Sequence, residues 1–234
     1  MRSIAFANQK GGVGKTTSAI HVAHGLSLAG ATVVLLDLDP QGNATVALQG
    51  MEAGDAIAPD AALIAVAPGF SLLPAPSAAS RSATDAFDHL VEFAARIAPQ
   101  VDWLVVDNPP RMDDWGRAGV QLCEEVVVPV QAEFLAMHGL SQMLRTLEDV
   151  AAEFAGKGTL RGVLPTMVDL REPVALEVLE DLRRNLGDRM LESVIFRDAN
   201  LVEAASFGRS AFHHCPWSKG ALCYAELTKE LIDG

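Results

Sequence analysis

Short apolar runs alternate with segments of helical spacing from one end of the chain to the other. This order is typical of a mostly parallel sheet flanked by helices, and uninterrupted apolar runs indicate strands buried on both faces. We therefore predict an α/β fold. The expected strands are residues 4–7, 31–37, 103–107, 126–130, 160–167 and 191–196. The expected helices contain residues 18–23, 82–97, 138–154, 173–186 and 218–232, with Gly30 as a helix stop, and residues 51–80 are left without an element.

The composition fits a single domain that spans residues 1–234. Half of the residues are hydrophobic, which is enough for one substantial core, and no stretch resembles a linker. The formal net charge of −12 argues against a generally basic nucleic-acid coat and suits a basic partner peptide. Three cysteines without a C-x-x-C pair argue against a disulfide framework. Because the sequence shows no signal peptide and no apolar run of membrane-spanning length, we expect a cytoplasmic protein without membrane contact.

The loop after the first expected strand carries the most specific chemistry. It reads Lys10-Gly11-Gly12-Val13-Gly14-Lys15-Thr16-Thr17 and leads into a helix. A glycine-rich turn leaves backbone N–H groups free to bind phosphate oxygens at the helix N-terminus. Lys15 would face the β- and γ-phosphates, and the Thr16 hydroxyl is placed to bind Mg²⁺. Gln9 stands where the ordinary P-loop has its first glycine, and a second lysine, Lys10, opens the loop instead.

Two aspartate motifs end expected strands, at the edge where ligands bind in open α/β sheets. The first reads Asp37-Leu38-Asp39-Pro40-Gln41-Gly42-Asn43, and alternation along the strand sends Asp37 and Asp39 to the same side, near one phosphate site. The second, Asp107-Asn108-Pro109-Pro110, ends an apolar strand as a Walker B carboxylate does. A lone aspartate here would more often begin a turn, but two such motifs after a P-loop favour a role at the site.

These motifs and three later stretches resemble the ParA branch of the ParA/MinD ATPases. The later stretches are Val128-Pro129-Val130-Gln131-Ala132-Glu133, Gly139-Leu140-Ser141 and Leu201-Val202-Glu203-Ala204-Ala205-Ser206-Phe207-Gly208. The resemblance runs nearly end to end, and its first two motifs are highly specific. It implies a SIMIBI-like P-loop NTPase with ATP and Mg²⁺ as cofactors, and slow hydrolysis that a partner stimulates.

The resemblance also assigns roles to the P-loop residues. Lys10 would reach across a nucleotide-sandwich homodimer to the ATP of the opposite subunit. Gly11, Gly12, Val13 and Gly14 would hold the phosphates, Lys15 would be the Walker A lysine, and Thr17 would lie near the α-phosphate. A lysine donated in trans makes neutralisation of the phosphate charge depend on dimerisation, as an arginine finger does elsewhere.

Other roles implied by the resemblance fall on the aspartates and on a late loop. Asp39 would orient the hydrolytic water, and Thr16, Asp39 and Asp107 would lie on the Mg²⁺ side of the site. Phe196-Arg197-Asp198 stands where the family's adenine-side loop reads Pro-Arg-Asn, so Phe196 and Arg197 are the expected base contacts.

The implied function is partition of plasmid or chromosome DNA. The ATP dimer would bind nonspecific DNA and associate with the nucleoid, and a ParB-like or other basic activator would trigger release as the ADP form. Arg183, Arg184 and Arg197 are the expected DNA contacts. Asn200 replaces a basic residue common in the family, and acidic residues lie among the arginines, so a solvated helix face is the plain alternative. The alternative function is positioning of a protein cargo, such as a microcompartment or receptor cluster.

Other classes of protein fit the sequence less well. His213, His214, Cys215 and Cys223 match no common zinc spacing, and we expect packing or surface roles for them. An iron–sulfur reductase of the nitrogenase iron-protein kind needs an interface cysteine in a glycine-rich setting, whereas Cys123 lies in Cys-Glu-Glu. A MinD-like membrane cycler needs a C-terminal basic amphipathic helix, which the residues up to Gly234 do not contain.

Overall fold

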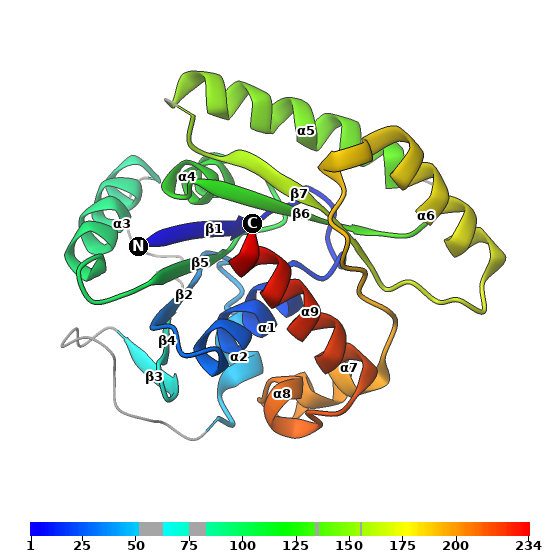
Figure 1. Ribbon diagram of the computed structural model, residues 1–234. Coiled ribbons are helices and arrows are strands. Elements are labelled where there is room, and N and C mark those ends of the chain that lie inside the picture. Colours follow the sequence, from blue (N-terminus) through cyan, green and yellow to red (C-terminus); the bar gives the residue numbers. More distant parts are fainter. Residues whose placement is uncertain (52–62, 75–82, 134–135, 155) are drawn as a thin grey trace.

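One twisted sheet runs through the protein, with helices on both of its faces (Figure 1). The computed structural model describes residues 1–51, 63–74, 83–133, 136–154 and 156–234. Its strands are β1 Arg2–Phe6, β2 Val33–Asp37, β3 Ile64–Ala67, β4 Phe70–Leu73, β5 Trp103–Asp107, β6 Glu125–Gln131 and β7 Thr159–Thr166. Its helices are α1 Lys15–Leu28, α2 Asn43–Leu48, α3 Ala83–Ile97, α4 Asp114–Leu122, α5 Ala136–Glu153, α6 Pro173–Leu186, α7 Ala199–Ser206, α8 Ala211–His214 and α9 Lys219–Asp233.

The strands are ordered β3-β4-β2-β5-β1-β6-β7, and all neighbours are parallel except β3 and β4. Successive residues of the central strands enter two separate cores. In β2, Val34 and Leu36 belong to the core shared with α3, α4, α5 and α6, whereas Val33 and Leu35 belong to the core shared with α1 and α9. This division confirms the mostly parallel α/β fold and explains why the strands are apolar without interruption.

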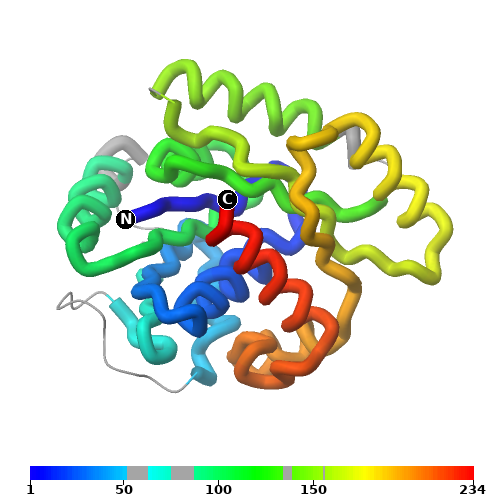
Figure 2. Tube along the Cα trace, in the orientation of Figure 1, coloured from blue at the N-terminus to red at the C-terminus, as the bar shows by residue number. Residues whose placement is uncertain are grey.

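Helix α1 follows the P-loop and lies beside α9 (Figure 2). The two helices approach closely, because a Cβ at Gly25 would clash with the Thr228 hydroxyl. The far end of α9 is tied to β1, where the Arg2 guanidinium donates hydrogen bonds to the Leu231 and Ile232 carbonyls at 3.2 and 3.3 Å. These bonds satisfy carbonyls that have no partner within the helix. No described helix, α9 included, is long and apolar enough to cross a membrane.

Two histidines on α1 pack in the interior. His21 Nδ1 lies 2.7 Å from the Thr17 carbonyl oxygen, and His21 Nε2 lies 2.9 Å from the Ala211 N–H. A carbonyl only accepts, so Nδ1 carries the proton while Nε2 accepts, and the ring is neutral. The ring also stacks on Tyr224 with 4.7 Å between centroids. Burial lowers the pKa of His21 and of His24 to about 4.

Most predicted elements are present with ends shifted by a few residues, but the predicted strand at 191–196 is wrong. Only isolated bridges form at Met190 and Phe196. The N–H groups of Glu192 and Ser193 bond instead to the Glu230 carboxylate on α9, at 2.8 and 2.9 Å, so the segment cannot continue a ladder. Residue 82, the predicted start of one helix, lies outside the described residues. Helices α2, α4, α7 and α8, and strands β3 and β4, were not predicted.

We expect His21→Gln to reduce the loss of stability on acidification. In the parent, the unfolded chain takes up a proton near pH 6.5 and the folded ring only near pH 4, so stability falls as pH drops between these values. By pH 5 this contribution amounts to about 2 kcal/mol. Glutamine keeps one donor and one acceptor but does not titrate. Urea unfolding at pH 7 and pH 5 would measure the difference.

His89→Gln is the matched control, because it makes the same substitution at an exposed position on α3. A parent and a His21→Gln variant with equal pH dependence would show that the His21 ring is not held neutral.

Candidate functional site

Three strands end level with one another and bring the predicted motifs together. Phe6 at the end of β1 pairs with Asp107 at the end of β5, and Asp107 in turn pairs with Asp37 at the end of β2. The P-loop after β1, the segment after β2 and the Walker B-like aspartate therefore lie at one edge of the sheet. The clustering expected from the sequence is present.

The P-loop has a fixed backbone that suits an anion. Gly12 and Gly14 have φ values of 75° and 88°, a region that side chains disfavour. Gly14 precedes α1, and no side chain caps the first N–H groups of this helix. The loop is held from behind by two hydrogen bonds, from the Thr166 hydroxyl to the Val13 carbonyl at 2.9 Å and from the Lys10 N–H to the Asn8 side chain at 3.1 Å. The free N–H groups and the positive end of the helix favour a bound anion.

The two lysines of the loop differ in environment. Lys15 is buried, and its Nζ donates to the Lys10 carbonyl oxygen at 3.0 Å. Burial lowers the pKa of Lys15, while the carboxylates of Asp107 and Asp39 act in the opposite direction. Lys10 is exposed, and its Nζ lies 2.7 Å from Glu133 Oε2. One lysine thus faces the interior of the site and the other lies at its rim.

Asp107 is completely buried, and neither of its carboxylate oxygens has a hydrogen-bond partner among the described residues. Burial raises the pKa of Asp107 to about 8, although the nearby Thr16 hydroxyl and Lys15 ammonium favour the charged form. A buried carboxylate without donors is costly unless a cation or another donor reaches it. The site therefore fits a divalent cation beside Asp107, with the Thr16 hydroxyl as a neighbouring oxygen.

Asp37 and Asp39 have different surroundings. Asp37 is fully buried and accepts hydrogen bonds from the Thr45 N–H and hydroxyl at 3.0 and 2.9 Å, so it anchors the start of α2. Asp39 lines the cavity at the P-loop, and its carboxylate accepts from the Gln41 N–H at 3.0 Å and the Asn43 amide at 3.1 Å. Asp39 therefore lines this cavity, whereas the Asp37 carboxylate is occupied by its hydrogen bonds with Thr45.

Two adjoining cavities meet at Gly14, Thr17, Asn43 and Met167. The first has a volume of about 380 Å³ and is lined by the P-loop and Asp39. The second has a volume of about 500 Å³ and a largely apolar wall from α2 and α7. The pair suits an elongated ligand with an anionic end and a flat, less polar end.

The predicted base contacts lie at the second cavity. Phe196 and Arg197 both line it, as the adenine-side loop was expected to do. Lys219 packs against the Phe196 ring, with its Nζ 3.7 Å from the ring centroid. Phe196 therefore offers a supported aromatic wall in place of the proline of the family pattern.

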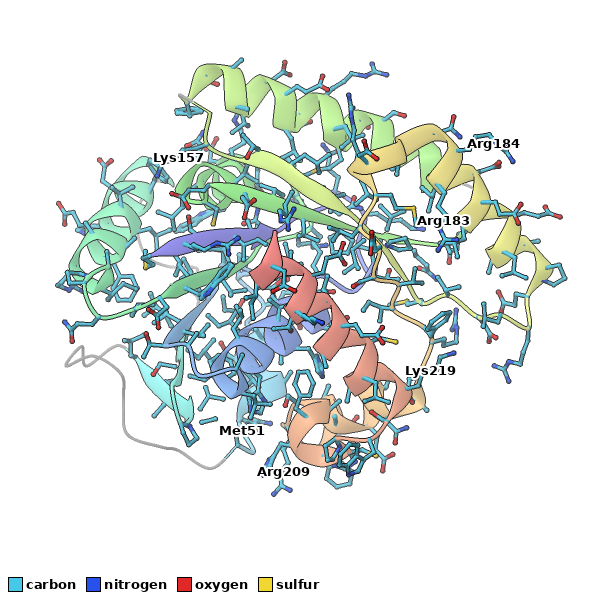
Figure 3. The ribbon with its side chains drawn as sticks, in the orientation of Figure 1. Met51, Lys157, Arg183, Arg184, Arg209 and Lys219 are labelled. Carbon is cyan, nitrogen blue, oxygen red and sulfur yellow. The ribbon has the colours of Figure 1, made fainter. Side chains whose placement is uncertain are left out.

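The predicted DNA-binding arginines occupy two different elements. Arg183 and Arg184 are exposed in the last turn of α6 (Figure 3), whereas Arg197 lies in the loop before α7. Arg184 pairs with Asp181 at 2.9 Å. Arg197 contributes to lowering the pKa of Asp169, after the larger effect of hydrogen bonds from Arg171. Two of the three arginines therefore have acidic neighbours within the chain.

Sequence reasoning gave no role to four residues that shape the site. Asn8 and Thr166 brace the loop, and Glu133 holds Lys10. Met167 lines both cavities and has a φ of 54°, unusual for a residue other than glycine. Asn8 directly precedes the loop, so its place could have been inferred. The other three lie more than 100 residues away in sequence, and no local pattern connects them with the loop.

The comparisons with known proteins agree with this geometry. Residues 4–211 match the CobQ/CobB/MinD/ParA nucleotide binding domain. The chain belongs to this family. The resemblance to the ParA branch is also confirmed at the level of individual relatives, which this ParA/MinD-type chain matches over nearly its whole length.

Two relatives and one solved structure illustrate the match. The chain is 39% identical to the chromosome-partitioning ATPase Soj of Thermus thermophilus, over 99% of this chain and 96% of the relative. It is 32% identical to the chromosome partitioning protein ParA of Caulobacter vibrioides, over 99% and 94%. It is 31% identical to cobyrinic acid a,c-diamide synthase from Mycobacterium smegmatis, solved with bound ADP and magnesium, with a TM-score of 0.79 over 99% and 94% of the chains.

We expect Gly14→Ala to lower the free energy of unfolding by about 1–2 kcal/mol, because alanine is strained at a φ of 88°. Gly11→Ala is the control in the same loop. Its backbone is outside the left-handed region and a Cβ there meets no atom within 4 Å, so stability should change by less than about 0.5 kcal/mol. Urea unfolding of both variants without nucleotide measures the difference, and equal effects would contradict the strained-loop interpretation.

Proposed function

We propose that this chain is an Mg²⁺-dependent ATPase that dimerises on ATP and partitions DNA. The observation that carries the proposal is the pair of lysines in one P-loop, Lys15 buried at the cavity and Lys10 exposed at its rim. The names of the relatives at 39% and 32% identity support partition as the task.

In this proposal the first cavity holds the phosphates and the second the adenosine. The N–H groups of residues 11–17 bind phosphate oxygens, and Lys15 moves its Nζ from the Lys10 carbonyl to the β- and γ-phosphates. Phe196 and Arg197 contact the base. The partly exposed Thr17 lies where the two cavities meet, which suits contact with the α-phosphate.

Thr16 and Asp107 are the residues that would hold Mg²⁺, Asp107 directly or through water. Phosphate oxygens and water would supply the remaining ligands of such an ion. When bound, Mg²⁺ neutralises charge on the phosphates. The Asp39 carboxylate would accept a hydrogen bond from the attacking water and so orient it. This carboxylate is kept in place by Gln41 and Asn43.

ATP binding and hydrolysis would control dimerisation and DNA binding in turn. Lys10 of each subunit neutralises the phosphates bound by the other, so that ATP stabilises the dimer and hydrolysis weakens it. The ATP dimer binds DNA without sequence preference, on the nucleoid, and a ParB-like or other basic activator stimulates hydrolysis. The net charge of −12 favours association with such a partner.

We expect Asp39→Ala to retain the ATP-dependent dimer and to lose at least about 100-fold in turnover, because orienting water is needed after binding. Lys15→Ala should instead abolish nucleotide binding, since it removes the main cation at the phosphates. Sedimentation velocity with ATP and phosphate release assays separate the two phenotypes. Parental turnover in Asp39→Ala would show that another group positions the water.

We expect the Asp39→Ala protein to bind DNA of any sequence with ATP and not with ADP, and affinity should fall steeply with salt. Arg183→Glu should weaken binding about tenfold and reduce the salt slope by about one, because it removes a phosphate contact. Arg117→Glu makes the same charge change on α4 and should leave binding unaltered. Electrophoretic shifts at several salt concentrations are the measurement.

Equal DNA affinity of the Arg183→Glu and Arg117→Glu variants would show that α6 does not contact DNA. An Asp39→Ala dimer that binds no DNA at low salt would favour the protein-cargo alternative over DNA partition.

A further inference from the structure

The exposed lysine of the P-loop is held by its own chain. Lys10 Nζ donates to Glu133 Oε2 at 2.7 Å, and the two side chains are 50% and 47% exposed. Glu133 follows the end of β6, at the same edge of the sheet as the P-loop. The Asn8 amide donates to the Pro129 carbonyl at 2.7 Å, which fixes the start of the loop against β6. Glu133 is therefore kept within reach of Lys10 by the fold itself.

This contact competes with the role proposed for Lys10. While the Lys10 ammonium is paired with Glu133, it is not in position to contact phosphates on another subunit. The backbone of Lys10 is engaged too, because its carbonyl accepts from Lys15 Nζ at 3.0 Å. In the free subunit both lysines are thus bound to oxygen atoms of their own chain.

The strength of the contact suits a reversible hold. An ion pair as exposed as this one shifts an equilibrium by a factor of up to about five. Such a bias is enough to keep most Lys10 side chains on Glu133. It is also small enough for the several negative charges of a triphosphate to overcome when a partner subunit presents them.

We propose that Glu133 is an autoinhibitory latch that holds Lys10 in its own subunit until the ATP of a second copy of this chain draws it away. The inference rests on the proposed ATP dimer. The pair adds a free-energy cost to dimerisation, because each subunit must break its Lys10–Glu133 pair before the interface forms. The strength of the dimer then depends on how much more favourable the contact of Lys10 with phosphate is than its contact with Glu133.

The first experiment measures dimerisation. In the Asp39→Ala background with saturating ATP and Mg²⁺, Glu133→Gln should lower the dimer dissociation constant by about 10- to 25-fold, because each of the two subunits no longer has to break a pair worth a factor of up to about five. Glu133→Asp should lie between parent and Gln. In a Lys10→Ala background, Glu133→Gln should change nothing further. Analytical ultracentrifugation over a concentration series gives the four constants of this double-mutant cycle.

A matched control accounts for net charge, since each subunit carries −12 and any lost carboxylate reduces repulsion. Glu153→Gln makes the same charge change at the end of α5, where Glu153 pairs with Arg117 at 2.8 Å. It should leave the dimer constant within about twofold. The latch would be overturned if Glu133→Gln lowered the dimer dissociation constant no more than Glu153→Gln does. It would also be overturned if Glu133→Gln had the same effect in the Lys10→Ala background.

The second experiment needs no dimer. Without nucleotide, acylation of Lys10 by an amine-reactive ester, followed by peptide mass spectrometry, should be several times faster in Glu133→Gln than in the parent or in Glu153→Gln. An unchanged rate would overturn the latch even if ATP dimers form. If no variant dimerises with ATP while the rate still rises, the proposed function fails and the ion pair is established in the free subunit.

Discussion

The shared carboxyl edge of the parallel strands is the constraint on which the rest of the structure depends. Strands β1, β2 and β5 run in one direction, so their following loops lie next to one another, and Phe6, Asp107 and Asp37 form one row across the sheet. Both faces of this sheet are covered by helices, which leaves its edges as the places where backbone groups and charged side chains meet solvent. The P-loop, the Asp39 segment and Asp107 gather there because the topology offers them this edge.

The buried ionisable groups at this edge are compensated to different degrees, and the difference indicates which of them await a ligand. Asp37 is stabilised by donors from Thr45, and it holds the chain in place. Lys15 has one carbonyl, from Lys10, and two carboxylates nearby. Asp107 has no hydrogen-bond partner among the described residues. Whatever binds beside Asp107 therefore stabilises the folded state by removing an unfavourable interaction as well as by adding contacts.

The sequence predicted the parts of the fold that local chemistry determines. Strand β5 matches its predicted range, because a short run of consecutive apolar residues is stable as a central strand that helices cover on both faces. The P-loop was predicted because eight consecutive residues carry its geometry. Residues 191–196 were mispredicted because their N–H groups bond to Glu230, on a helix about 40 residues later. The partner of Lys10 could not be predicted either, since Glu133 reaches it only through the placement of β6 beside β1.

In the cycle that we propose, ATP and ADP differ only by the γ-phosphate, so the protein can distinguish them only through groups that reach it. A ligand shifts a conformational equilibrium only by its difference in affinity for the two states. Adenosine contacts at Phe196 and Arg197 are the same for both nucleotides and cannot contribute to this difference. It must come from Lys15, Asp39 and the Lys10 of the partner. Lys15 and Lys10 are bound in the free subunit to oxygen atoms of their own chain. Part of the favourable interaction with the γ-phosphate therefore offsets the loss of these contacts, and the remainder determines the strength of the dimer.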